Sequence, residues 1–207
     1  MSGNGKGWAN PAPAGLVALG VACFIFYALL GGKVEHTCIP LLGIWLLGGF
    51  VVQLIVGLME LMEGAIVGGN VFTFFAAFFM LAGGLEMIFK YYASIHGWPM
   101  DTRIDGWAWL VLSFSLILWT PAYLKSGPLS LIGIILALDV ATVLVAFKDL
   151  AILTAPWAGP TIALFMLISG ILGMYTAAGI ILNTTFGRVV LPLGGPLIKD
   201  TSTSVGA

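Results

Sequence analysis

The stretch PLSLIGIILALDVATVLVAF, residues 128–147, has one ionisable side chain, Asp139, among twenty residues. A hydrocarbon core about 30 Å thick is crossed by roughly 20 apolar residues in an α-helix. Similar apolar runs lie at 13–31, 39–59, 71–92, 107–124 and 160–183. We therefore predict an all-α integral membrane protein, a compact six-transmembrane-helix protomer that forms a single domain over residues 1–207.

The overall composition agrees with this class of protein. Of the 207 residues, 60% are hydrophobic and 8% are charged. Such a chain has too little polar surface to cover a water-soluble globule. The formal net charge is -1 and no run of basic residues occurs. We therefore expect no large soluble catalytic domain, and no nucleic acid as a partner.

The sequence lacks the motifs of soluble enzymes. It has no phosphate-binding loop and no nucleophile elbow, and His36 and His96 are 60 residues apart. Cys23 and Cys38 have no His or Cys partner at metal-ligand spacing. We therefore expect neither an enzyme nor a metal site, and we expect no cofactor.

Prolines mark the predicted beginnings of helices, because proline is tolerated in a first turn. They are Pro11, Pro13, Pro40, Pro128 and Pro160. Pro121 lies inside the fourth run, where we expect it to kink the helix or to end it near Thr120. The eight Lys and Arg residues fall four on each predicted side of the membrane, so charge does not decide the orientation.

Ionisable residues inside the spans are functional candidates, because a charge in lipid is energetically expensive. Asp139 is the deepest of them. It is interpreted either as a residue held by a neighbouring helix or a cation, or as a proton-binding or pore-lining residue. Glu86 and Lys90 are four residues apart on the third span, so they can neutralise each other on one helix face.

Two further helix faces carry candidate residues. Phe72, Phe75 and Phe79 recur at helical spacing on the face that holds Glu86 and Lys90. This stripe is interpreted either as core or lipid contact, or as a hydrophobic constriction of a pore.

On the second span, Gln53 and Glu60 are seven residues apart and form a polar line on one face. Glu60 can equally be a solvated residue at the membrane surface. The 28 glycines predict close helix packing, with Gly83 and Gly84 among the candidate contacts.

The strongest local motif is Asn10-Pro11-Ala12-Pro13-Ala14-Gly15-Leu16, just before and within the first span. Two prolines force an extended chain, and Asn10 can satisfy amides at the start of the helix. An open helix N-terminus attracts anions. The residues alone therefore indicate either a structural cap or a place where an anion is received.

This heptapeptide closely resembles the signature of the acetate uptake transporter family, the succinate-acetate permeases, and differs at Ala14, where the family usually has Leu. Further blocks of the chain are similar to the family in the same order. They are Gln53-x-x-x-Gly57-Leu58-Met59-Glu60 with Gly64, Phe72-Thr73, Tyr175-Thr176-Ala177-Ala178-Gly179, Leu182-Asn183, and Gly187-Arg188-Val189-Val190-Leu191-Pro192-Leu193-Gly194.

The resemblance implies a hexamer of six-helix protomers in the plasma membrane, with cytoplasmic termini and a carboxylate pathway in each protomer. It places an apolar constriction at Leu19, Phe75 and Leu138. The family has an aromatic ring at the first position and commonly Tyr at the second, so Leu19 and Phe75 are departures. Asn10, Pro11 and Pro13 belong to the signature at the expected substrate entry. Asn10 and Thr73 are the expected hydrogen-bond donors to the substrate.

The leading hypothesis is therefore transport of acetate and other small carboxylates, succinate included, by an anion channel or a proton symporter. A charged Asp139 next to Leu138 would repel an anion, whereas a protonated one would not. One alternative is a structural or interaction membrane protein that conducts no solute. Another alternative is a pore for a small neutral solute or ammonia.

Overall fold

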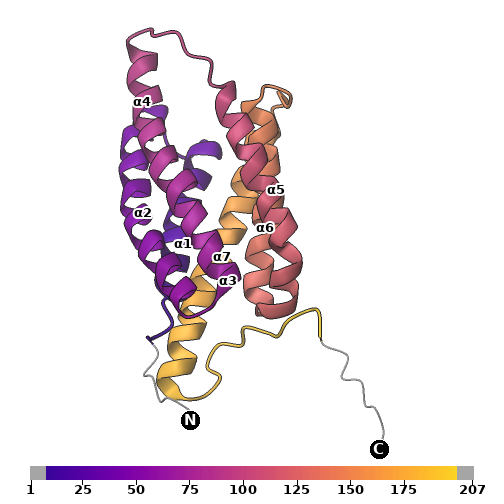
Figure 1. Ribbon diagram of the computed structural model, residues 1–207. Coiled ribbons are helices and arrows are strands. Elements are labelled where there is room, and N and C mark those ends of the chain that lie inside the picture. Colours follow the sequence, from indigo (N-terminus) through magenta and orange to yellow (C-terminus); the bar gives the residue numbers. More distant parts are fainter. Residues whose placement is uncertain (1–7, 200–207) are drawn as a thin grey trace, which may run out of the picture.

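The computed structural model describes residues 8–199, and within them every long element is a helix (Figure 1). The helices are α1 (Ala12–Leu30), α2 (Ile39–Met62), α3 (Ile66–Phe74), α4 (Gly83–Ile95), α5 (Arg103–Ser126), α6 (Leu129–Asp149) and α7 (Ala158–Phe186), with a short 3-10 turn η1 (His36–Cys38) and a π-helix η2 (Phe75–Ala82). Six segments are long and apolar enough to cross a membrane, because α3, η2 and α4 form one continuous span, Ile66–Ile95. The prediction of six membrane-spanning helices is confirmed.

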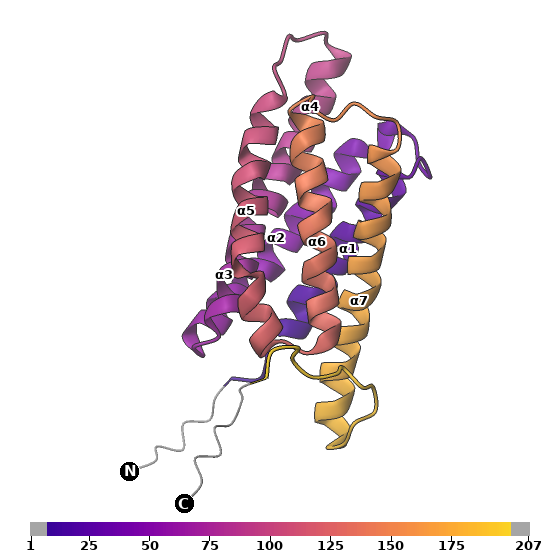
Figure 2. The same ribbon diagram turned by 90° about the vertical axis from the view of Figure 1, so that its right-hand side faces the viewer.

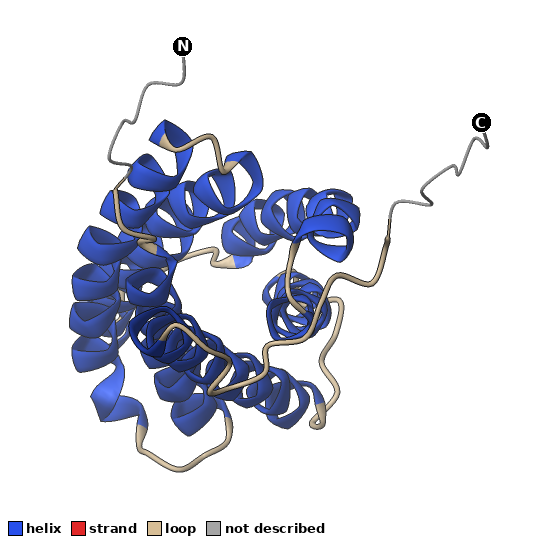
Figure 3. Ribbon diagram, turned by 90° about the horizontal axis from the view of Figure 1, so that it is seen from below, coloured by secondary structure: helices blue, strands red, loops and turns tan. Residues whose placement is uncertain are grey.

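The spans form a ring, seen from below in Figure 3. Each span packs on the next along the chain, and α7 closes the ring by packing along α1. The contact between the third and fourth spans, made by α3 and α5, is the smallest contact between neighbouring spans of the ring. Helices α1, α3 and α6 begin at the lower end in Figures 1 and 2, the end to which the chain also returns after α7.

The observed helix ends differ from the expected ones at two prominent places. Helix α5 runs through Pro121 to Ser126 and does not end near Thr120. Membrane helices tolerate an internal proline where neighbouring groups satisfy the freed backbone. The third span begins at Ile66 and not at 71, because the chain turns at Gly64, whose φ is 83°.

The π-helix η2 interrupts the ordinary helical period in the middle of the third span. Its rings pack against two other spans: the Phe79 centroid lies 5.5 Å from Phe26 of α1 and 5.7 Å from Trp109 of α5. A π-turn is rare and is stable only where such packing supports it, and it often marks a functional site. The aromatic side chains therefore hold the π-helical part of this span against α1 and α5.

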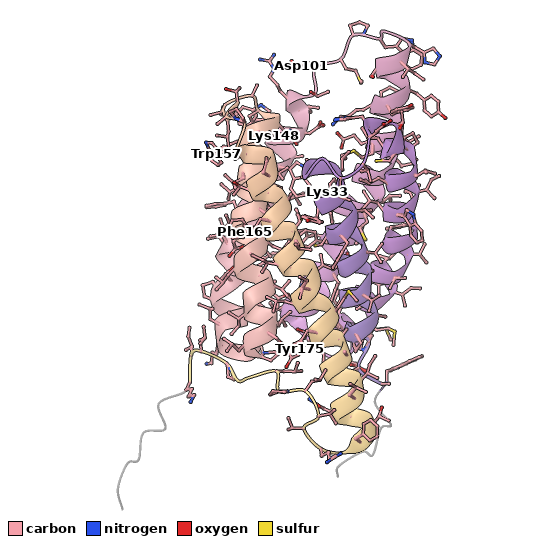
Figure 4. All side chains as sticks on the ribbon, turned by 180° about the vertical axis from the view of Figure 1, so that it is seen from behind. Lys33, Asp101, Lys148, Trp157, Phe165 and Tyr175 are labelled. Carbon is pink, nitrogen blue, oxygen red and sulfur yellow. The ribbon has the colours of Figure 1, made fainter. Side chains whose placement is uncertain are left out.

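Residues 187–199, the C-terminal strap, fold back across the lower end of the ring. The Asn183 side chain accepts from Leu191 N (3.0 Å) and donates to Leu191 O (2.8 Å), and the Tyr175 hydroxyl donates to Pro192 O (2.8 Å). Figure 4 shows Tyr175 beside this segment. The strap also reaches the α5–α6 turn, where Ser130 N donates to Leu193 O and Leu197 N donates to Leu124 O. The residues after the last span are thus part of the fold.

Two glycines bring α2 and α4 into backbone contact. A Cβ atom added at Gly84 would lie 2.9 Å from Gly43 O, and one added at Gly43 would lie 2.6 Å from Gly84 O. Both distances are shorter than any real Cβ contact, so each position requires glycine as long as the two helices stay in place. The neighbouring Gly83 is different, because its nearest such atom is 3.8 Å away.

We therefore expect Gly84→Ala to destabilise the protein by about 1 to 3 kcal/mol, the usual effect of overpacking, and Gly83→Ala to have little effect. Thermal unfolding of the two purified variants in detergent measures the difference. Equal melting temperatures for the two variants would show that α2 and α4 are not held at this distance.

Candidate functional site

The ring of helices encloses a lower cavity of about 640 Å³. All six spans contribute to its wall, which is mostly apolar. Among the side chains that line it are Leu19, Gln53, Glu60, Phe75, Tyr123 and Leu138. A cavity of this size and polarity is typical of a small-molecule site.

An upper cavity of about 160 Å³ lies in the other half of the ring. Its apolar wall includes Phe79, Trp109 and Met166. Its charged lining residues are Glu86, Lys90, Asp105, Lys148 and Asp149. In Figure 4, Lys148 lies toward the upper end of the molecule, opposite to the end where the chain begins.

Aromatic rings separate the two cavities. Phe75 lines the lower cavity and Phe79 the upper one, and their ring centroids are 5.8 Å apart in an edge-to-face arrangement. Leu19 and Leu138 are buried and line the lower cavity together with Phe75. The three residues that resemblance assigns to a constriction thus come from α1, η2 and α6 and share one cavity wall.

The stripe expected on the third span faces the interior of the ring. Phe72 and Phe75 line the lower cavity, and Phe79, Glu86 and Lys90 line the upper one. The expected ion pair between Lys90 and Glu86 is present, and Lys90 also pairs with Asp105 at the start of α5. Lys90 therefore ties α4 to α5 beside the upper cavity.

The heptapeptide borders the mouth of the lower cavity. Asn10, Pro11 and Ala12 line it, and Asn10 Oδ1 accepts from Ala12 N (2.9 Å), so the side chain caps the start of α1. A Cβ atom added at Gly15 would lie 2.6 Å from the Phe72 ring. The absence of a side chain at Gly15 therefore lets the Phe72 ring approach α1 closely.

Gln53 and Glu60, the polar line on α2, both face the lower cavity. Gln53 Nε2 donates to Gly15 O (3.3 Å), while Oε1 is buried and has no partner in the described part of the chain. The Glu60 carboxyl lies against the first turn of α3, where a Cβ atom on Gly68 would overlap Oε2. Glu60 is 8% exposed, so it is not a solvated surface residue.

Thr73 and Asp139 line neither cavity. The Thr73 hydroxyl bonds to Gly69 O in its own helix, and Thr73 packs on Gly57 of α2. Asp139 Oδ2 accepts from the Thr120 hydroxyl (2.7 Å), which links α6 to α5. For Asp139 this geometry matches the interpretation as a residue held by a neighbouring helix.

Sequence reasoning missed several residues of the two cavities. Tyr123 of α5 is buried in the lower wall, and Trp109 and Asp105 of the same helix line the upper cavity. Thr176 lines the lower cavity and donates to the Ser130 hydroxyl (2.9 Å). Asp105 had a signal, because it is an acidic residue at the expected start of a span on the same side as Lys90.

The loop above the ring carries an exposed ion pair. The Arg103 guanidinium contacts Asp101 at 2.6 Å and holds the pKa of that carboxyl at about 2. Asp101 therefore stays charged at every physiological pH, so it does not contribute to any pH dependence of this loop.

These features define a multi-pass membrane protein in which six spans surround two internal cavities. The chain is homologous to the succinate-acetate/proton symporter SatP of Escherichia coli K12, with 28% identity over 197 residues, 90% of this chain and 95% of the relative. The SatP protein of Shigella flexneri matches to the same extent. The resemblance to the acetate uptake transporter family is thereby confirmed.

A solved structure, described as the bacterial acetate channel SatP, has the same fold. Its TM-score is 0.75 at 25% sequence identity, and the match covers 90% of this chain and 99% of the other. No protein-family model matches the chain. These relatives are a symporter and a channel, which are transport proteins and not enzymes.

The ion pairs of Lys90 give a test of the upper cavity. Lys90→Met leaves Glu86 and Asp105 partly buried without a cation, so we expect the free energy of unfolding to fall by about 1 to 3 kcal/mol. The double variant Lys90→Met/Asp105→Asn should recover part of this loss. Chemical or thermal unfolding in detergent measures both.

The exposed Lys33 provides the control, since Lys33→Met should leave the stability unchanged. The defect of Lys90→Met should also shrink at low pH, where the two carboxyl groups become protonated. A pH-independent defect, or none, would contradict an electrostatic role for Lys90.

Proposed function

We propose that the chain carries acetate and other small carboxylates, with succinate as a further candidate, through a pathway inside each protomer. The observation that carries this proposal is the pair of internal cavities separated by Phe75 and Phe79 in a homologue of SatP. A pathway open at one end and closed by side chains in the middle is what a transporter at rest requires. A structural protein has no need of a cavity of about 640 Å³.

The polarity of the lower cavity supports a small acid as the solute. Apolar side chains such as Leu16 and Val71 can receive a methyl or methylene group. The N-terminal ends of α1, α3 and α6 all lie at its rim, and helix N-termini favour carboxylates. The C-terminal ends of α2 and α5 lie there too and offset part of this attraction.

We place the gate of the pathway at Leu19, Phe75 and Leu138, with Phe79 behind them. Leu19 is smaller than the aromatic ring of the family pattern, and Phe75 lacks a hydroxyl group. The gate proposed here is therefore wholly apolar. The Phe75 ring stacks on Phe74 at 4.6 Å, so opening requires Phe75 to move with a packed neighbour.

The assembly and its setting are proposed from the resemblance. The protomers would form a hexamer in the plasma membrane, with both termini in the cytoplasm and the lower cavity open to it. Protons are the proposed second solute, because the homologous SatP of Escherichia coli is a succinate-acetate/proton symporter. Lipid would cover the outer apolar faces that do not meet another protomer.

A pore for a small neutral solute is a second candidate function. It is favoured by one observation: within residues 8–199, the lower cavity is lined by no Lys, Arg or His side chain. Such a wall offers nothing to hold an anion by charge. A neutral solute would meet no electrostatic obstacle at the apolar gate.

Uptake of labelled acetate and succinate into proteoliposomes tests these functions, with protein-free vesicles subtracted. A carboxylate pathway gives saturable uptake in which each acid competes with the other. Leak-level flux would reject carboxylate transport, and swelling driven by a neutral solute would then favour the second candidate. Running the assay with and without an inward proton gradient separates a symporter from a channel.

For the gate, we expect Phe75→Ala to raise the flux of succinate several-fold relative to that of acetate, because the opening becomes wider. Phe75→Leu should have an intermediate effect. The matched control is Phe89→Ala, since Phe89 is exposed and lines neither cavity. A wild-type ratio in Phe75→Ala would remove Phe75 from the gate.

A further inference from the structure

The charged side chains that line the lower cavity would repel a free anion. Its wall includes two carboxylate side chains, Glu60 and Glu63, and in the described residues no basic side chain. Tyr123 of α5 is the remaining titratable group of the wall, while α1, α3, α6 and α7 contribute none. A carboxylate that enters this cavity as an anion is therefore repelled by like charges in a medium of low dielectric constant.

Glu60 and Glu63 differ in their surroundings. Glu63 is exposed at the rim of the cavity, whereas Glu60 is 8% exposed and faces the interior. The Glu60 carboxyl lies against Gly68 in the first turn of α3, where the first amides of a helix have no acceptor within the helix. These amides can stabilise the charged form of Glu60, and the cavity that the side chain faces gives the protonated form access to water and to a substrate.

Gln53 adds an unsatisfied acceptor two turns further into the cavity. Its Nε2 must face Gly15 O, because a carbonyl oxygen only accepts hydrogen bonds. Its Oε1 therefore faces away from Gly15 and remains buried without a partner in the described residues. A carboxylate has no hydrogen to offer this oxygen, but the hydroxyl group of a carboxylic acid has one.

We propose that the lower cavity takes up its carboxylate together with a proton, with Glu60 as the proton-exchanging residue and Gln53 Oε1 as the acceptor for the protonated acid. This inference rests on the proposed transport of carboxylates. Glu60 first receives a proton from water. The O–H bond of the Glu60 carboxyl then breaks as an O–H bond forms on the substrate, and Glu60 returns to its charged form.

For acetate, one proton and one carboxylate anion are converted into one neutral acid, and succinate requires the same transfer at each of its two carboxylate groups. The neutral acid donates its hydroxyl hydrogen to Gln53 Oε1 and presents its apolar end to Leu19 and Phe75. A neutral solute crosses the apolar gate at far lower cost than an anion, because a bare charge there would lose its hydration without compensation. Proton coupling thus follows from the composition of the cavity wall.

The experiment uses the full chain in proteoliposomes that contain a pH-sensitive dye. Labelled succinate and acetate are supplied with an inward proton gradient, and protein-free vesicles are subtracted. Wild-type protein should accumulate the acid and acidify the lumen. Glu60→Gln keeps the shape but removes the exchangeable proton, so it should lose both gradient-driven accumulation and exchange of labelled for unlabelled acid.

Glu35→Gln is the matched control, because Glu35 is exposed and lines neither cavity, and it should keep gradient-driven accumulation. Glu60→Asp distinguishes this loss from a failure to fold, since a retained carboxyl group must restore accumulation and exchange. Failure of that rescue would overturn the proposal.

The outcomes separate the two proposals. Wild-type uptake that ignores the proton gradient, or accumulation by Glu60→Gln equal to wild type, overturns the role of Glu60 and leaves carboxylate transport standing. No wild-type uptake of either acid above the vesicle background overturns both.

Discussion

The backbone of a membrane-spanning chain must satisfy its hydrogen bonds without water, and this constraint determines most of the present structure. It makes each of the six spans helical and confines the turns to the two ends of the ring (Figure 2). It also leaves the interior as the place for polar side chains, so Gln53, Glu60 and Lys90 face the two cavities. The candidate site is thus a consequence of the same requirement that forms the helices.

Side chains must nevertheless fill part of the interior of a ring of helices, or the spans would pack directly onto each other. The aromatic side chains of η2 do this: Phe75 and Phe79 meet inside the ring, and Phe79 contacts both α1 and α5. On the wall itself, the glycine pair Gly43 and Gly84 allows the opposite, a close backbone approach of α2 and α4. Large residues inside and small ones between neighbouring helices together keep a cavity open in the lower half of the ring.

The number of spans and much of the interior face could be predicted from the sequence. Hydropathy identifies the six spans, and helical spacing places Phe72, Phe75, Phe79, Glu86 and Lys90 on the face that lines the cavities. The direction of a single side chain across an interface was beyond such reasoning. Thr73 turns to its own backbone and Asp139 to Thr120, because the partner that decides each orientation is an individual group on the same or a distant helix turn.

Two other features depend on contacts that no local pattern encodes. The π-turn at Phe75–Ala82 exists because rings from α1 and α5 pack on it, and the C-terminal strap is held by Asn183 and Tyr175 across gaps of eight and seventeen residues. The blocks of sequence that resemble the family were visible without a structure. Their physical purpose was not, since the exit sequence after α7 fastens to the α5–α6 turn at the rim of the lower cavity.

The two cavities differ in charge, and this difference bears on how an acid can cross the membrane. The upper cavity mixes two ammonium groups, Lys90 and Lys148, with three carboxylates, whereas the charged groups of the lower wall that the structure describes are the carboxylates Glu60 and Glu63. An anion that passes the proposed gate downward therefore leaves a cavity of mixed charge and meets a wall whose described charged groups are all carboxylates. A solute that crosses as a neutral acid meets neither obstacle, because it loses little hydration at the gate and is not repelled below it. The arrangement is thus in keeping with the proposed movement of the acid together with its proton.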